Sequence, residues 1–294
     1  MKRLVTLLAT ALSLFSISCS PKEEEQQATL IISAIPDEKV SDQNARFQPL
    51  KDYLASELGI PVEFVISADY GAAVERFKNG EVHLAWFGGL TGAQARAAVE
   101  GAQAIAQGDV DPQYKSYFIA HKSTGLTPST DFPEEIKDMT FTFGSRSSTS
   151  GRLMPTYFIM QETGKTPEQF FSQPVQFRKT GGHDATARAV ASGAVQVGAI
   201  SYKKYDSMIA DGEISAEDAP IIWTTPYYAD YNLTAHPAIE ELFGKGFTEK
   251  LTEALLKIED PKVLKAFNRN KLISAKNEDF QGIVDVAKEV GLMK

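Results

Sequence analysis

The chain has 294 residues, of which 43% are hydrophobic and 23% charged, and its formal net charge is −8. This length allows one large core or two modest ones. The acidic balance argues against a nucleic-acid partner, which would need basic patches, but it does not exclude a small anion, because backbone N–H groups and hydroxyls can form an anion site without any cation.

The first residues are typical of a secretory signal peptide. Lys2 and Arg3 are followed by a mostly apolar, uncharged run from Leu4 to Ile17. A membrane-spanning helix needs about 20 apolar residues, so a permanent anchor helix is the weaker alternative. We therefore expect residues 1–18 to be removed on export.

Cys19 is the only cysteine, so it cannot form a disulfide within the fold. It directly follows the apolar run and a small residue, Ser18, as in bacterial lipoprotein signals, although Ser16 departs from the usual leucine. We expect lipidation at Cys19, with residues 19–28 as a flexible tether to a bacterial membrane. Simple cleavage, which would give a soluble periplasmic protein, is the alternative.

The following segment alternates β-rich runs with helical spacing. Strands are expected over Thr29–Ala34, Pro61–Ser67, Val82–Trp86, Ala102–Gln107 and Tyr117–His121, and helices over Asn44–Leu58, Tyr70–Lys78 and Thr91–Glu100. This rhythm favours a parallel sheet with helices on its faces.

A second unit of the same kind begins near residue 125. Its expected strands are Met139–Phe143, Val175–Arg178, Val195–Ile200 and Pro220–Thr224, and its expected helices are Thr149–Thr163, Asp184–Ser192 and Lys203–Asp211. From Pro237 onward the pattern is mostly helical. We predict an α/β fold with one lobe formed by residues 29–120 plus 226–294, another formed by residues 121–225, and a ligand cleft between them.

The stretch Thr140–Gly151 carries the clearest chemical signal. An expected strand runs into a loop rich in hydroxyl side chains, and a helix begins directly after it. Free N–H groups at the helix start, together with the hydroxyls of Ser148, Thr149 and Ser150, would form an anion site. The alternative is that these residues only cap the helix. Pro155 is expected to interrupt this helix early, because it lacks an N–H.

Three further turns offer candidates. His183 lies in a glycine-rich turn before a helix, as a structural residue or as a donor to the anion. Asp69 is most simply the cap of the next helix, and the adjacent Tyr70 either packs in the core or directs its hydroxyl at the cleft. Trp86–Gly89 either lines the pocket or packs.

Taken in order, these motifs resemble those of the phosphonate- and phosphite-binding proteins of ABC importers. The similar stretches are Asp69–Glu75, Leu84–Gly88, Ser147–Gly151, Gly182–Asp184 and Ala189–Gly193. The resemblance implies a two-lobed periplasmic binding protein of the type II kind, with a hinge and a ligand cleft. It implies that Ser148, Thr149 and Ser150 hold the oxyanion, that Tyr70 and His183 complete the cage, and that Tyr227 forms an aromatic wall near the hinge.

One departure from the family pattern bears on the ligand. Ser201 stands where the family usually has an aspartate that accepts the proton of a phosphonate or phosphite. A carboxylate only accepts, whereas serine can donate, so Ser201 shifts the expected ligand toward sulfate or selenate, and the chain is similar to the branch labelled as selenate binders. Asp69, Asp184 or Asp230 is an alternative acceptor.

We therefore expect a monomeric binding protein that delivers its ligand to an ABC permease in the inner membrane, without enzymatic activity, cofactor or metal. The four histidines lack metal-ligand spacing. Two other classes stay open: a sensor module for a signalling partner, and a periplasmic hydrolase that would use Ser150 with His183.

Overall fold

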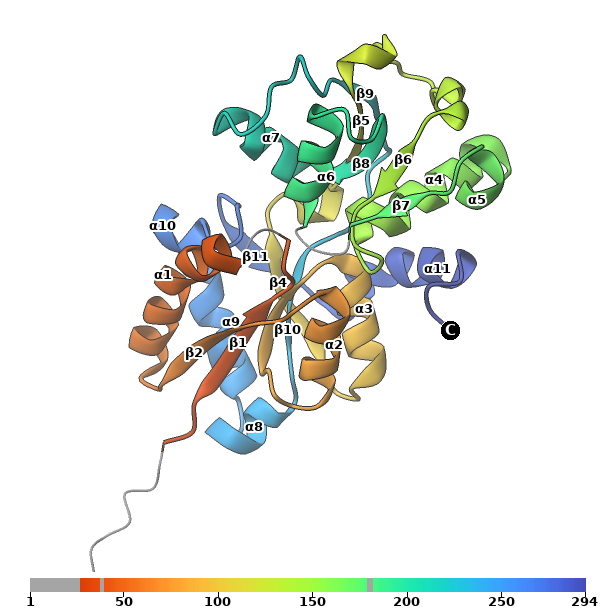
Figure 1. Ribbon diagram of the computed structural model, residues 1–294. Coiled ribbons are helices and arrows are strands. Elements are labelled where there is room, and N and C mark those ends of the chain that lie inside the picture. The colour runs from red at the N-terminus through yellow and green to blue at the C-terminus, as the bar shows by residue number, and fades with distance from the viewer. Residues whose placement is uncertain (1–26, 38–39, 179–181) are drawn as a thin grey trace, which may run out of the picture.

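The computed structural model describes residues 27–37, 40–178 and 182–294. The expected signal peptide, Cys19 and most of the tether lie outside these residues. The chain folds into two α/β lobes, each built on its own sheet (Figure 1). Within the described ranges, no helix is long and apolar enough to cross a membrane.

The first lobe contains a mixed six-stranded sheet in the order β11-β4-β10-β3-β1-β2. Its strands are β1 (Leu30–Ala34), β2 (Val62–Ile66), β3 (Leu84–Phe87), β4 (Gln103–Gly108), β10 (Asn232–Ala235) and β11 (Leu272–Ser274). β1 pairs in parallel with β2 and β3, but β10 is antiparallel to β3 and β4, and β11 is antiparallel to β4. The expectation of a parallel sheet is thus wrong for this edge, because β10 enters the sheet on the return from the second lobe.

Two groups of helices flank this sheet. α2 packs with α3, whereas α1 packs with α9 and α10, and α11 lies against α3 (Figure 1). Their bounds are α1 (Val40–Leu58), α2 (Tyr70–Lys78), α3 (Gly89–Ala98), α8 (Ala238–Phe243), α9 (Phe247–Leu256), α10 (Pro261–Leu264) and α11 (Gln281–Glu289). Large apolar side chains such as Phe47, Phe77 and Trp86 are fully buried between the layers and form the core.

The second lobe contains a five-stranded sheet in the order β7-β6-β8-β5-β9. Its elements are β5 (Ser116–Ala120), β6 (Phe141–Phe143), α4 (Met154–Thr163), α5 (Pro167–Phe170), β7 (Gln176–Phe177), α6 (His183–Ala191), β8 (Val197–Ser201), α7 (Tyr202–Ala210) and β9 (Ile221–Thr224). β6 is parallel to β7 and β8, and β5 is antiparallel to β8 and β9.

Two crossing segments, residues 109–115 and 225–231, join the lobes. They run antiparallel and bond to each other: the Tyr114 N–H donates to the Tyr228 carbonyl (2.8 Å) and the Tyr228 N–H donates to the Tyr114 carbonyl (3.0 Å). Farther along, the Asp230 N–H donates to the Asp111 carbonyl (3.1 Å). The connection is therefore a paired ribbon, the natural place for a hinge.

The helix expected over Thr149–Thr163 begins with a π-helical turn, η4 (Thr149–Leu153), before α4 takes over at Met154. Pro155 lies in the first turn of α4 and has no N–H to donate back to a carbonyl of the preceding η4 turn. The early interruption expected from Pro155 is thus present as a change of helix type, and π-turns of this kind are frequent at functional sites.

Candidate functional site

The serine-rich turn, which contains Ser148, Thr149 and Ser150, lies buried at the junction of the two lobes. Ser148 caps η4, because its hydroxyl accepts the Gly151 N–H (3.0 Å), and this bond leaves the hydroxyl proton to donate elsewhere. Ser148, Thr149 and Ser150 are each at most 2% exposed. The first N–H groups of a helix have no partner within it, so this turn offers backbone and hydroxyl donors in a site without bulk water.

A glycine at position 151 is required for this geometry. The Gly144 N–H donates to the Gly151 carbonyl (2.8 Å), which holds the end of β6 against the turn. A Cβ at position 151 would lie 2.9 Å from the Ser148 hydroxyl oxygen and 3.1 Å from Cε1 of His183. Any larger residue would therefore push apart the turn and the histidine.

His183 begins α6 and faces the serine-rich turn. Its Nε2 lies 3.4 Å from the Ser150 hydroxyl oxygen, and its Nδ1 accepts the Ser201 N–H (3.4 Å). Burial lowers the pKa of His183 to about 4, with Asp37 acting against that shift, so the ring is neutral at pH 7. Since Nδ1 is an acceptor, Nε2 carries the proton and is a neutral donor.

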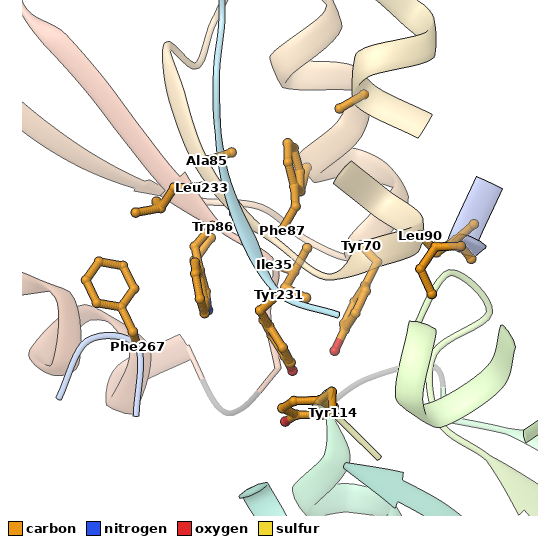
Figure 2. Close-up of a cluster of buried hydrophobic side chains, with 14 of the residues drawn as sticks. Ile35, Tyr70, Ala85, Trp86, Phe87, Leu90, Tyr114, Tyr231, Leu233 and Phe267 are labelled. Carbon is orange, nitrogen blue, oxygen red and sulfur yellow. The ribbon is translucent and has the colours of Figure 1, made fainter. Parts of the chain in front are cut away.

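Tyr70, at the start of α2, reaches this junction from the first lobe. The side chains of Tyr70 and Tyr231 point toward Tyr114 of the first crossing segment (Figure 2). Burial, followed by Asp37 and Asp230, raises the pKa of Tyr70 well above its usual value, while hydrogen bonding with Ser148 acts the other way. The phenol therefore stays protonated, and it links the first lobe to the serine-rich turn.

Thr149 is engaged differently from its two neighbours. Its hydroxyl oxygen accepts the N–H of Leu90 (2.9 Å), in the first turn of α3. The same hydroxyl hydrogen-bonds with Asp230 of the second crossing segment. Thr149 thus connects the second lobe to the first lobe and to the hinge, in addition to lying in the expected anion turn.

Asp230 is a buried carboxylate in this cluster. Its Oδ1 accepts the N–H of Gly89 (2.8 Å), and its Oδ2 is buried and has no partner among the described residues. Burial raises the pKa of Asp230 to about 7, and the bonds from Gly89 and Thr149 act against this shift. Asp230 is thus close to its titration midpoint at neutral pH.

The other two alternative acceptors are placed less favourably. Asp69 is exposed and caps α2 by accepting the Ala72 N–H (2.8 Å), as its sequence context predicts. Asp184 is buried in the first turn of α6, and its Oδ1 has no partner in the part of the chain that the structure describes. Asp230 is the alternative acceptor that contacts both lobes.

Ser201 ends β8 beside His183. Its hydroxyl oxygen lies 2.5 Å from that of Tyr114, and it also accepts the Lys204 N–H (3.4 Å) as the cap of α7. Sequence reasoning gave Tyr114 no role, because no motif or periodicity surrounds it. The structure places Tyr114 on the first crossing segment, in contact with Ser201.

Tyr227 is the one expected site residue that the structure does not bring to this junction. It is 65% exposed, and its ring lies 5.9 Å from the Lys115 ammonium. Its neighbour Tyr228 is buried instead and bonds the Ser116 hydroxyl (2.6 Å). Along an extended segment successive side chains point in opposite directions, so a one-residue difference decides which tyrosine faces inward.

The two lobes touch closely at this junction. The His183 N–H donates to the Asp37 carbonyl (3.2 Å), and a Cβ on Gly182 would lie only 2.0 Å from that carbonyl oxygen. The Asp37 carboxylate is paired with Arg46 (2.8 Å). Within the described ranges, no cluster of histidine, cysteine, aspartate or glutamate could hold a metal. The expected cage is thus a buried, closely packed group of neutral donors contributed by both lobes.

Comparisons with known proteins agree with this geometry. Residues 32–280 match the family model described as ABC transporter, phosphonate, periplasmic substrate-binding protein. The chain is 32% identical to the probable ABC transporter phosphite binding protein PhnD1 of Prochlorococcus marinus (strain MIT 9301), with 98% of each chain covered. It is 29% identical to the phosphate-import protein PhnD of Mycolicibacterium smegmatis, with 80% of this chain and 77% of that protein covered.

A solved structure supports the same assignment. The structure of Prochlorococcus marinus PhnD1 in complex with methylphosphonate superposes with a TM-score of 0.83 at 32% identity, covering 90% of this chain and 98% of that one. The expected fold class, a two-lobed periplasmic binding protein, is thereby confirmed.

Proposed function

The chain belongs to the periplasmic substrate-binding proteins of phosphonate ABC transporters, and from this premise we propose that it captures a small tetrahedral oxyanion between its lobes and delivers it to an ABC permease. The proposed ligand contacts are Ser148, Ser150, His183 and Tyr70, with the Thr149 backbone at the start of η4. In this proposal the crossing segments act as the hinge, and the protein works as a monomer.

One observation carries this proposal. Ser150, His183 and Ser148 from the second lobe and Tyr70 from the first lobe converge as uncharged donors, all at most 3% exposed. Each hydrogen bond from such a donor to an anion contributes about 1.5–3 kcal/mol, so a few of them account for micromolar binding, about −8 kcal/mol.

The primary candidate ligand is phosphite or a small alkylphosphonate. The relative with 98% coverage is named as a phosphite binder, and its structure holds methylphosphonate. Asp230 lies beside the cage, with one oxygen that lacks a partner among the described residues, and its ionised form would repel a dianion more than an anion that keeps a proton.

Sulfate or selenate is the second candidate, and Ser201 favours it. Without the family's aspartate at this position, the site lacks an acceptor for a ligand proton next to His183, and the Ser201 hydroxyl pairs with Tyr114. An oxyanion without a proton at neutral pH would meet only donors there.

The geometry around His183 supports binding rather than hydrolysis. A serine hydrolase needs a histidine whose Nε2 is free to take the serine proton, and a carboxylate that receives the Nδ1 proton. Here the Ser201 N–H donates to Nδ1, so Nε2 already holds the proton that it presents to Ser150. The pair is therefore suited to donating to an anion.

Calorimetric titration of the purified protein with phosphite, methylphosphonate, phosphate, sulfate and selenate at pH 7 tests this function. Micromolar or tighter binding of phosphite or methylphosphonate supports the first candidate. Binding of sulfate or selenate alone, with phosphite binding gained by Ser201→Asp, supports the second. If no anion in the panel binds, the proposed function is wrong.

We also propose that Cys19 carries a lipid and holds the protein at the membrane surface facing the periplasm. The apolar run before Cys19 and the polar stretch after it support this proposal. Membrane and soluble fractions of cells that express the wild-type protein and Cys19→Ser give the test. The wild-type protein should sediment with membranes and the variant should be released, and equal distributions would contradict lipidation.

A further inference from the structure

The second crossing segment places one carboxylate where the lobes and the hinge meet. Asp230 is 1% exposed, and its main chain bonds to the first crossing segment. Its Oδ1 accepts the Gly89 N–H at the start of α3, and its Oδ2 is buried without a partner among the described residues. A buried carboxylate oxygen without a donor is unfavourable unless the group is protonated.

The Thr149 hydroxyl completes this contact from the second lobe. Its oxygen accepts the Leu90 N–H, and its proton is directed to Asp230. A Cβ added to Gly88 would lie 3.1 Å from the Thr149 hydroxyl oxygen and 3.3 Å from Asp230 Oδ1, which shows how tightly the three parts meet. A hydroxyl that gives its proton to Asp230 cannot also donate to an oxyanion. The side chain of Thr149 therefore serves the contact between the lobes, while Ser148 and Ser150 remain available to the ligand.

The groups that interact electrostatically with Asp230 are one ion pair and several neutral phenols. Asp111 lies on the first crossing segment and pairs with Arg269, so the two charges largely cancel. The other titratable groups that interact electrostatically with Asp230 are phenols, which burial keeps neutral: Tyr70, Tyr114, Tyr228 and Tyr231. Asp230 thus has the Gly89 N–H and the Thr149 hydroxyl as neighbours, and within the described ranges it has no paired cation.

We propose that Asp230 is the positioning residue that locks Thr149 of the second lobe against the first turn of α3, and that it takes up a proton as the lobes close around the ligand. This inference rests on the proposed function, because it concerns how the anion site forms. Opening the lobes would remove Thr149 and admit water to Asp230, returning the carboxyl toward its ordinary pKa.

The direction of the pH effect follows from the two states. An open, hydrated Asp230 has a pKa of about 3.9, whereas burial raises the pKa to about 7 in the closed form. Between these values closure takes up a proton, so closure and affinity strengthen as the pH falls. A bound anion raises the pKa of the closed form further. Linkage with a closed-form pKa of about 7 predicts about tenfold tighter binding at pH 6 than at pH 8.

The test is the affinity of wild-type protein and Asp230→Asn at pH 6, 7 and 8 for methylphosphonate, or for sulfate or selenate if only those anions bind in the titration panel. The ligand's own titration is common to both proteins and cancels in the ratio of their affinities. The amide still accepts the Gly89 N–H but does not titrate. We expect the wild-type protein to gain about tenfold over Asp230→Asn between pH 8 and pH 6. A constant ratio overturns the inference, whereas failure of the wild-type protein to bind any anion of the titration panel would instead refute the proposed function.

Proton uptake in the wild-type protein is an independent measurement that needs no variant at position 230. Calorimetry at pH 6.5 in buffers of different ionisation enthalpy should give more than half a proton taken up beyond that due to the ligand. If no proton is taken up, the proposal is overturned.

Thr149→Val and Thr149→Ser form a matched pair of variants. The hydrogen bond from the Thr149 hydroxyl lowers the pKa of Asp230. Because only the valine variant loses this bond, only that variant should have the midpoint of its affinity profile at higher pH. The same midpoint in both variants contradicts the locking role of Thr149.

Discussion

Asp111 and Asp230 lie on the two paired crossing segments, and both carboxylates are completely buried, yet in the part of the chain that the structure describes only Asp111 is paired with a cation. Nε of Arg269 lies 3.0 Å from both oxygens of Asp111, and the Gly108 N–H adds a bond of 2.7 Å. Burial opposes the charge of Arg269, but Asp111 outweighs this effect, and the pKa of Arg269 is raised. Asp230 faces Thr149 and the start of α3 with one oxygen unpaired.

This difference separates a fixed part of the hinge from a responsive one. Asp111 and Arg269 connect the first crossing segment to the end of the first lobe, and the Arg269 guanidinium also lies over the rings of Trp86, Tyr114 and Tyr231. Burial raises the pKa of Asp111, but the charge and hydrogen bonds of Arg269 act against this shift, so the pair stays charged near neutral pH and fixes geometry. A buried carboxylate without a cation changes its protonation with its surroundings, so it can respond when the lobes move.

The largest expected effect is on the fixed pair. Arg269→Met would leave Asp111 charged, buried and unpaired, which typically costs about 3–5 kcal/mol of unfolding free energy. Chemical denaturation at pH 7 measures this loss. The double variant Asp111→Asn with Arg269→Met is the matched control and should recover part of the loss, because the buried charge is gone. A loss below about 1 kcal/mol in the single variant would mean that Asp111 does not need its partner.

Removing the carboxylate of Asp230 should stabilise the protein relative to the wild type as the pH rises, in contrast to the loss expected at the Asp111–Arg269 pair. The folded-state pKa of Asp230 is raised to about 7, so its contribution to stability is complete below pH 4 and is lost as the pH rises toward 7. At about 1.36 kcal/mol for each pKa unit, Asp230→Asn should gain about 2–4 kcal/mol relative to the wild-type protein between pH 4 and pH 8. Denaturation series at both pH values measure this. A variant whose relative stability does not change with pH would remove the contrast with Asp111.

A third prediction separates ligand contacts from structural contacts. Ser150 bonds to His183 only at 3.4 Å, so Ser150→Ala should cost less than about 1 kcal/mol of unfolding free energy. Losing a donor to a charged ligand should weaken binding about 10–100-fold. Titration calorimetry and thermal unfolding of the same preparation give both numbers. Ser145→Ala, outside the cage, is the control, and equal affinities of the two variants would remove Ser150 from the site.

The smallest effect is expected at Tyr227. Because this side chain is 65% exposed and lies away from the cage, Tyr227→Ala should change affinity less than about twofold, within the range typical of surface substitutions. Tyr228→Phe, which removes the buried hydroxyl bonded to Ser116, is the inward-facing comparison and should cost more stability. A tenfold loss of affinity in Tyr227→Ala would restore this residue to the ligand site.

Local signals were sufficient for much of the fold and for part of the site. α2 spans the same residues as predicted, because Asp69 caps its start and Asn79 and Gly80 end it. The strand–turn–helix pattern around Ser148–Ser150 also predicts a buried polar turn, since the capping residue and the first N–H groups come from one short stretch.

Long-range pairing accounts for what the sequence could not predict. β10 and β11 are short, and they become strands by pairing with parts of the chain more than 100 residues earlier: β10 with β3 and β4, and β11 with β4. Tyr114 and Asp230 have no local motif, and they gain their roles from the pairing of the two crossing segments. The choice of Tyr227 over Tyr228 depends on which side of an extended segment faces the hinge, and composition does not determine that.

The most direct test of the whole account is a crystal structure of the protein with the tightest-binding anion of the titration panel. We expect the oxyanion within about 3 Å of the Ser148 and Ser150 hydroxyls and of His183 Nε2, with the Thr149 hydroxyl still accepting the Leu90 N–H beside Asp230. An anion bound away from this turn would contradict the assignment of the site. A Thr149 hydroxyl turned onto the anion would contradict the division between ligand contacts and the lock at Asp230.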